Sequence, residues 1–537
     1  MKKKLALAVL MGAVLTCTGI ISACSTTENS ENSEVTEEKE DTSEVQGESA
    51  TEIEYPDELE ELEMMATVVF GETSGISGSG IELLEENTYS IIAGGVYEFS
   101  GTLEDGMIFI NTEDTVEIRL NGASITSSAG PVIYGENSKD LYISTVEGTT
   151  NVLQDGTNYE TDEAGEAIGK GTIFSNDDIY FLGAGSLTVN GNYKHAICSD
   201  DSVFVEGGTL TLAAVKDGIN ANDTLMVDGG EIVIADAYEG LEGTFVIVNE
   251  GSLDITVSDD AINAAADLQV NGGMLYAICT TGDALDSNGS MELTGGVVVV
   301  HGGEMPEGGL DCDQSVISIT GGTIIATGGT NSSPSEDNSQ YSILLGSANA
   351  GSSVGILDEA GNTVFAFASE ISYTNMVVSI AGIEADATYT VYTDGTISGS
   401  DNFHGFYADG VYEGGTESQT FTADSMVISA GGTAGMMGGG FGGGRGNKGE
   451  FGQQFENGEM PEKMTVPEGT EMPEGMEMPE GMEMPEGMEK PEGMERPEEM
   501  EMPEDLELPE DAKPSEEIGR PVETPQPQDE SGETVTE

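Results

Sequence analysis

Apolar and polar residues alternate along short runs between about residues 100 and 330, and the runs return at a regular interval. Stretches such as TLTL, EIVIA and LDITV alternate with a period of two, which predicts β-strands with one buried face. A branched apolar residue recurs about every 22 positions along this region. The series comprises Ile173, Ile197, Ile219, Leu241, Ile262, Leu285 and Leu310.

A second pattern, V-x-V-x-G-G, recurs in step with the first. Its glycines indicate a corner with positive φ between two strands of one turn. Repetition at this interval is typical of a solenoid in which each repeat forms one turn. Leucine-rich repeats would need a leucine-asparagine ladder, and propeller blades are about twice as long. The pattern occurs at 203–208, 225–230, 246–251, 268–273, 291–296 and 317–322, with a looser version ending at Gly185.

The repeat predicts an all-β fold, a single-stranded right-handed parallel β-helix of about nine coils. We expect the helix domain to span 63–340. Residues 341–432 read as antiparallel hairpins that cap the last coil, which would otherwise offer an edge for aggregation. An acidic Ser/Thr/Glu-rich linker covers 25–62, and a glycine-rich segment followed by a Met-Pro-Glu-Gly repeat covers 433–537. Their composition predicts disorder at both ends.

The first 24 residues, MKKKLALAVLMGAVLTCTGIISAC, have the lysines, apolar run and small residues of a secretion signal. The final Ile21–Cys24 resembles a lipoprotein processing site, with Cys24 as the residue that would carry the lipid. The alternative is an ordinary signal peptide with a chance cysteine. We therefore expect a bacterial lipoprotein on the extracellular face of the cell membrane, in contact with the membrane only through its lipid anchor.

Charge narrows the classes of partner. The chain has 100 acidic and 16 basic residues, and its formal net charge is -84. Such a surface repels nucleic acid and anionic membranes. Neutral sugars, cations, and acidic polymers bridged by cations remain. Cys198 and Cys312 are predicted to lie five coils apart, roughly 24 Å, so they cannot form an intramolecular disulfide.

Stacked coils would place equivalent acidic residues roughly 4.8 Å apart, where two unit charges repel by roughly 3 kcal/mol at an effective dielectric of 20. Such columns need a cation, a lysine partner or shifted pKa values, and oxygen-only ligands suit Ca²⁺. The alternative is that the acids are solvated corner residues and the asparagines a self-bonded ladder. One column comprises Asp217, Glu239, Asp260 and Asp283, and the other Asn220, Glu242, Asn263, Asp286 and Asp311.

Lysines form a third column beside the acids. Lys170, Lys194 and Lys216 each precede a repeat, and Tyr238 continues their register. One interpretation is a basic strip that binds uronic-acid carboxylates directly and through Ca²⁺. The other is a ladder of salt bridges that neutralises neighbouring acids. The sequence leaves both open.

The run KDGINANDTLMVDGGEIVIADAYEGLEG resembles a clostridial family of carbohydrate-binding parallel β-helix lipoproteins, similar in fold to polysaccharide lyases. The resemblance covers about residues 100–430. It implies surface display, Ca²⁺ bound within the helix, and attachment to plant cell-wall polysaccharides such as cellulose and pectin. The positions that match for Ca²⁺ are the acids and amides of the two columns. The chain departs from the expected polar pattern at Cys198 and at 264–266.

Three functions follow. The first, which we favour, is a monomeric, non-catalytic polysaccharide binder that stacks sugar rings on tyrosines. The second is a Ca²⁺-dependent pectate-lyase-like enzyme with Lys216 as base, although neighbouring acids disfavour a neutral lysine and no arginine lies between Arg119 and Arg445. The third is a structural adhesin or spacer. The candidate stacking residues are Tyr134, Tyr142, Tyr180, Tyr193, Tyr238 and Tyr276.

Overall fold

The computed structural model describes residues 52–55, 61–71, 75–84, 87–161, 165, 167–313 and 317–433. The predicted signal peptide with Cys24, most of the linker, and the C-terminal repeat lie outside these residues. The described chain consists of strands β1 to β40 joined by turns, and it contains no helix long and apolar enough to cross a membrane.

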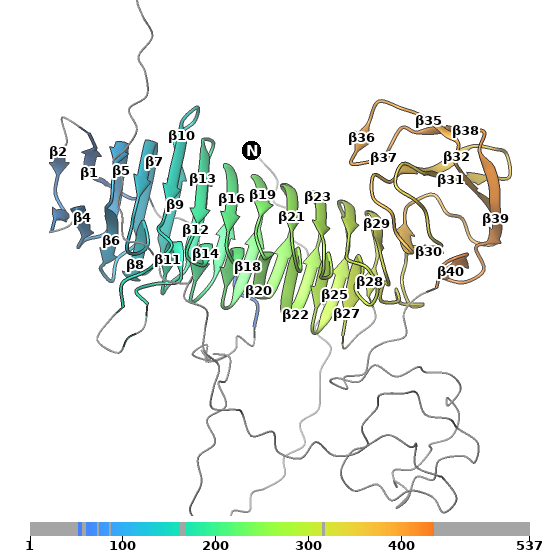
Figure 1. Ribbon diagram of the computed structural model, residues 1–537, viewed down its shortest axis with the longest axis horizontal. Coiled ribbons are helices and arrows are strands. Elements are labelled where there is room, and N and C mark those ends of the chain that lie inside the picture. Colours follow the sequence, from blue (N-terminus) through green and yellow to red (C-terminus); the bar gives the residue numbers. More distant parts are fainter. Residues whose placement is uncertain are drawn as a thin grey trace, which may run out of the picture. The chain divides into compact units, whose positions relative to one another are not determined.

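The strands wind into a parallel solenoid of about 10 turns (Figure 1), which confirms the predicted fold class. Each full turn contributes to three parallel faces. The first face is formed by β4 (Thr88–Ile91), β6 (Met107–Asn111), β8 (Ile133–Asn137), β11 (Gly171–Ser175), β14 (His195–Ser199), β17 (Asp217–Ala221), β20 (Glu239–Val248), β22 (Ile262–Val270), β24 (Leu285–Ser287) and β27 (Leu310–Cys312).

The long strands β20 and β22 also belong to the second face, and two early strands of the second face extend into the third. The second face contains β1 (Met64–Val69), β5 (Gly95–Leu103), β7 (Val116–Thr126), β9 (Leu141–Thr145), β12 (Ile179–Gly183), β15 (Val203–Val205), β18 (Thr224–Val227), β25 (Ser290–Leu293) and β28 (Ser318–Ile319). The third contains β10 (Thr150–Gln154), β13 (Ser186–Gly191), β16 (Thr209–Ala214), β19 (Glu231–Asp236), β21 (Ser252–Val257), β23 (Met274–Cys279), β26 (Val297–His301) and β29 (Thr323–Gly328).

The register of the first face is the one that the repeat predicts. Ile173 pairs with Ile197, and the pairing continues coil by coil through Ile219 and Leu241 to Leu310. These side chains point inward and are at most 1% exposed. They belong to one hydrophobic core that runs the length of the solenoid. The branched apolar residues and the V-x-V-x-G-G pattern repeat with the same period. The inward residues and the glycine corners therefore specify how the coils stack, whichever residues point outward.

Glycines form the corner that follows the second face. Gly230 has φ of 82°, and the equivalent glycines of the neighbouring repeats are also positive. The close stacking of these corners also excludes a side chain, since a Cβ on Gly230 would lie 2.8 Å from the carbonyl oxygen of Gly208. In the looser repeat that ends at Gly185, the positive φ falls on Gly183 instead.

The two ends of the solenoid are closed differently. At the first end, β1 pairs antiparallel with β2 (Gly75–Gly78), and β3 (Ile81–Leu83) pairs antiparallel with β4. At the other end, β33 (Asn375–Ser379) pairs antiparallel with β29 and β30 (Ser342–Leu345), and β40 (Val427–Ala430) pairs parallel with β30. The remaining C-terminal strands form antiparallel sheets: β31 (Ser353–Asp358), β32 (Thr363–Ala368), β34 (Thr388–Thr393), β35 (Thr396–Ser398), β36 (Asn402–Phe403), β37 (Phe406–Tyr407), β38 (Val411–Glu413) and β39 (Thr416–Thr422).

A comparison of two glycines tests the corner. Gly122, with φ of 76°, has nothing within 4 Å of the position that a Cβ would take, whereas Gly230 faces backbone atoms. Alanine at either position suffers the left-handed strain of about 1–2 kcal/mol. We therefore expect Gly230→Ala to lower the urea midpoint of unfolding clearly more than Gly122→Ala. Equal shifts in the urea midpoint would show that the close packing of the glycine corners does not contribute to stability.

Candidate functional site

A single outward-facing column on the first face holds most of the candidate chemistry. Its residues alternate with the buried apolar column and therefore point away from the core. The early coils contribute aromatic rings, and the later coils contribute amides and carboxylates. In chain order the column consists of Phe109, Tyr134, Phe174, Cys198, Asn220, Glu242, Asn263, Asp286 and Asp311.

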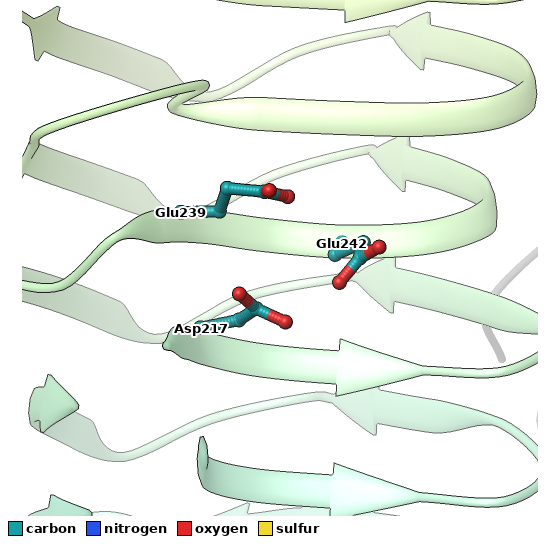
Figure 2. Close-up of side chains that lie close together, drawn as sticks. All are labelled: Asp217, Glu239 and Glu242. Carbon is teal, nitrogen blue, oxygen red and sulfur yellow. The ribbon is translucent and has the colours of Figure 1, made fainter. Parts of the chain in front are cut away.

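Three carboxylates from two adjacent coils come together in the middle of the first face (Figure 2). Asp217 begins β17, and Glu239 and Glu242 lie on β20, directly over it. One oxygen from each side chain lies within 4.8 Å of the others. Asn220 joins the group by donating from Nδ2 to Asp217 Oδ2 at 3.0 Å and to Glu242 Oε2 at 2.5 Å. The three carboxylates supply oxygen atoms as potential ligands, while Asn220 presents the donor Nδ2 to them.

Asp217 is the most constrained member of this carboxylate cluster. Its side chain is fully buried, and His195 Nδ1 lies 2.9 Å from its Oδ2. Its other oxygen, Oδ1, has no hydrogen-bond partner among the described residues. A buried carboxylate oxygen without a partner costs free energy, since it loses water and gains nothing in return. An interaction with a positively charged group would offset this cost.

The two glutamates carry the electrostatic strain of the cluster. Burial, together with the nearby charges of Glu242 and Asp217, raises the pKa of Glu239 to about 8. Burial and the adjacent Asp217 raise the pKa of Glu242 to about 7. At neutral pH a cation beside these two glutamates would therefore favour their ionised forms.

The other predicted acidic ligands do not join this cluster. Asp260 Oδ1 accepts a hydrogen bond from the backbone nitrogen of Asp283 at 2.7 Å, and Asp283 Oδ1 accepts one from Gly308 at 2.5 Å. Asp311 Oδ1 accepts from Ser332 Oγ at 2.6 Å. These carboxylates connect successive turns. Asn263 lies between the two groups and donates to Glu239 Oε2 at 3.3 Å.

Burial also raises pKa values in this second acidic group. The pKa of Asp260 is about 6, that of Asp283 about 9 and that of Asp286 about 7. Repulsion from Asp311 adds to the effect of burial in all three cases. The predicted columns thus exist, but their members have two different roles.

The lysine column follows the register that the sequence predicts. The backbone nitrogen of Lys216 donates to the carbonyl of Lys194 at 2.8 Å, and that of Tyr238 donates to Lys216 at 2.7 Å. Lys170 Nζ lies 2.6 Å from Asp200 Oδ1, a close salt bridge. Lys216 Nζ lies at the rim of the carboxylate cluster, 3.9 Å from Asp217 and 4.0 Å from Glu242.

Three of the tyrosines predicted to stack on sugars are buried. Tyr142 and Tyr180 are each 1% exposed and stack on each other in the outward column of the second face, against which Ile53 packs. Tyr276 is 9% exposed and stacks on His404 of the C-terminal region. For these three the prediction is wrong, because other parts of the chain cover the outward columns that carry them.

The remaining tyrosines differ in their surroundings. Tyr193 stacks on Tyr159 with ring centroids 4.1 Å apart. Tyr238 is 45% exposed, and its hydrogen bond to Asp259 raises its pKa to about 12. Tyr134 is half-buried and lies in the first-face column with Phe109 and Phe174. Phe109 and Phe174 were not among the predicted site residues. The register that aligns Ile173 with Ile219 nevertheless aligns Phe174 with Asn220.

The chain is similar to a family of sequences, to one curated protein and to one solved structure. A sequence model of carbohydrate-binding domain-containing proteins matches residues 85–280 and 246–425. A carbohydrate-binding domain-containing protein from Acetivibrio thermocellus is 32% identical over 133 residues, which are 24% of this chain and 46% of that protein. The structure of a polysaccharide lyase-like protein from C. thermocellum is 26% identical, with a TM-score of 0.40, over 43% of this chain and 97% of that one.

The raised pKa of Asp283 predicts how stability depends on pH. An unfolded aspartate titrates near pH 3.9, whereas folded Asp283 titrates near pH 9, so the folded state holds a proton that the unfolded state releases. This contribution is fully present below about pH 4 and is lost as the pH rises toward 9. We therefore expect the urea midpoint, measured in a chelator, to fall between pH 5 and pH 8.

Asp283→Asn should reduce that fall, since the amide oxygen still accepts from Gly308 but does not ionise. Glu292→Gln removes one charge at an exposed position of the second face and serves as the control. If both variants changed the pH slope equally, the effect would reflect net charge rather than the buried carboxyl group.

Proposed function

The chain belongs to the family of carbohydrate-binding domain-containing proteins, and we propose that it is a non-catalytic, calcium-dependent polysaccharide binder. The observation that carries the proposal is the buried, unpartnered Oδ1 of Asp217 within a cluster of three carboxylates on the outward face. The relative from A. thermocellus bears the same family description, and this chain covers less than half of its length.

The chemistry of the cluster fits Ca²⁺ better than a transition metal. Carboxylate and amide oxygens are the ligands that Ca²⁺ prefers, whereas zinc sites favour nitrogen and sulfur. Asp217, Glu239 and Glu242 would hold the ion, with the Asn220 side chain next to them. The bound ion would offer coordination positions to sugar hydroxyl or carboxylate oxygens. It would also offset repulsion of about 3 kcal/mol for each pair of unit charges at this spacing, at an effective dielectric of 20.

Lys216 supplies positive charge at the rim of the same cluster. Its Nζ lies within 4.0 Å of two carboxylates, so it can reach a ligand carboxylate beside the ion while compensating the cluster. Lys170 is engaged by Asp200 at 2.6 Å, which supports the salt-bridge interpretation for that residue. The polymer that fits this combination is one with uronic-acid units, such as pectin.

A binding role explains the site better than β-elimination does. A lyase would need a neutral base, and the carboxylates beside Lys216 favour its ammonium form. A second positive residue to hold the substrate carboxylate would also be expected, yet the sequence between Arg119 and Arg445 contains no arginine. We propose further that the lipid on Cys24 holds the protein on the outer surface of the cell, where it would meet plant cell-wall polysaccharide.

Calcium calorimetry on the full-length protein tests the proposal. Glu239→Gln and Glu242→Gln should each weaken Ca²⁺ binding by more than roughly tenfold. Roughly tenfold is the loss expected when a residue that only supports a metal ligand is removed. Asp311→Asn is the matched control, because Asp311 lies in the same column and is held by Ser332. Equal loss in the control, or no heat of Ca²⁺ binding at all, would contradict the metal site and favour a structural adhesin.

Titration with polygalacturonate tests the ligand and the absence of catalysis. We expect the full-length protein to bind the polymer with Ca²⁺, to release it on chelation, and to produce no ultraviolet absorbance from unsaturated sugars. Rising absorbance that Lys216→Ala abolishes would identify a lyase instead.

A further inference from the structure

The aromatic end of the first-face column opens into a cleft of about 600 Å³. Phe109, Tyr134 and Phe174 form its floor, on three successive coils. Leu84, which is 50% exposed, lines one side, and Ile168 lines another. The carboxylate cluster lies further along the same column, so the cleft is a separate feature of the face that carries the proposed metal site.

The cleft wall includes residues 167–170 of the insertion between β10 and β11, of which 155–161, 165 and 167–170 are described. Backbone hydrogen bonds hold it, from Ile168 to Glu160 at 2.9 Å and from Glu160 to Ala129 at 2.7 Å. Gly169 has φ of 87° and approaches Phe174 so closely that a Cβ would lie 2.9 Å from the ring. The insertion therefore covers Phe174, which is 4% exposed, while Phe109 and Tyr134 stay half-buried.

The rings are arranged to leave aromatic surface available. Tyr134 and Phe174 stack with centroids 5.5 Å apart and planes 27° apart. Phe109 and Tyr134 are also 5.5 Å apart, but their planes differ by 65°. In an edge-to-face pair one ring keeps both faces uncovered by the other. Phe109 and Tyr134 are both half-buried, so ring surface remains available to a ligand at this end of the ladder.

The polar groups of the cleft indicate an uncharged ligand. Lys170 Nζ lies 5.9 Å from the centre of the Phe174 ring and is paired with Asp200. Glu136 is exposed at the rim and accepts a hydrogen bond from Asn111. Because Asp200 already compensates the lysine and Glu136 adds negative charge, a uronic-acid carboxylate is disfavoured here. Sugar hydroxyls can instead bond to Glu136, Lys170 and Thr88, which all line the cleft.

We propose that this cleft is a second saccharide subsite, which stacks neutral hexose units of an extended, equatorially linked chain on Phe109 and Tyr134. Equatorial substituents leave the axial C–H bonds of a hexose to pack on an aromatic face. An extended chain can also follow a straight column of outward side chains. The inference rests on the proposed function in one respect, that both sites serve polysaccharide, but the cleft needs no cation.

The separation of the two sites follows from the fold. Four coil spacings connect Tyr134 with Glu242 through Phe174, Cys198 and Asn220. At roughly 4.8 Å for each spacing, the distance is roughly 19 Å. This distance spans several sugar units, so the two subsites would contact different segments of one polysaccharide chain.

The test is calorimetric titration of the full-length protein with cellohexaose, in a chelator and in Ca²⁺. We expect equal binding in both conditions, and weaker binding of maltohexaose, whose axial linkage coils the chain. Phe109→Leu keeps apolar volume but removes the ring, and should weaken cellohexaose binding by roughly five- to tenfold, the equivalent of one aromatic contact. Phe109→Tyr should retain binding.

Glu292→Gln is the matched control, because Glu292 is exposed on the second face, away from both sites, and the variant should leave cellohexaose binding unchanged. The cleft assignment is overturned if cellohexaose binds no better than maltohexaose, if chelation abolishes its binding, or if Phe109→Leu and Tyr134→Leu bind it normally. Binding of polygalacturonate with Ca²⁺ but not of cellohexaose would overturn the cleft alone. Failure with both polymers would overturn the proposed function as well.

Discussion

The stacking of each residue on its equivalent in the next coil is the constraint on which the rest of this structure depends. Inward positions repeat the same apolar types, so the core is continuous along the solenoid. Outward positions face copies of their own chemistry, roughly 4.8 Å away. Stacking is favourable for isoleucines and for aromatic rings, but it is unfavourable for carboxylates. Asp217 stacks on Glu239 beside Glu242, so the repeat brings carboxylates together at a cost in stability that the proposed cation would offset.

The same constraint accounts for the coverings over the other two faces. Outward apolar columns expose surface unless another segment packs on them. On the third face, Tyr276, Val299 and Ile325 stack in register and join the core of the C-terminal strands. On the second face, Ile53 packs on the column that contains Tyr180. The first face differs, because its column keeps half-buried aromatic, amide and carboxylate groups that remain accessible to a ligand.

The sequence was sufficient to predict the fold and the order of the coils. The branched apolar residues and the V-x-V-x-G-G pattern repeat in step, and the apolar residues define the inward column. It was less informative about roles within the outward columns. Asp217 and Asp283 have the same place in the repeat, yet one has an unpartnered oxygen and the other accepts a hydrogen bond from Gly308. The donor to Asp283 is Gly308, which lies in the turn before Leu310. Burial of Tyr142 depends on segments distant in sequence, which no periodic pattern reports. The insertion at 155–170 interrupts the period before Phe109 can be aligned, whereas Phe174 lies after the insertion, in register with Cys198.

A column that changes from aromatic to acidic along one rigid face has a consequence for recognition. The coils fix the distance between the two chemistries, so a stiff polymer that satisfies both subsites does so without reordering the protein. Once one segment is bound, the second binds at a high effective concentration, and modest contacts at each end suffice for firm attachment. Such an arrangement gains nothing from cleaving its ligand, since cleavage between the subsites would remove that advantage. With the proposed pair of subsites, the face would suit retention of a long chain rather than its breakdown.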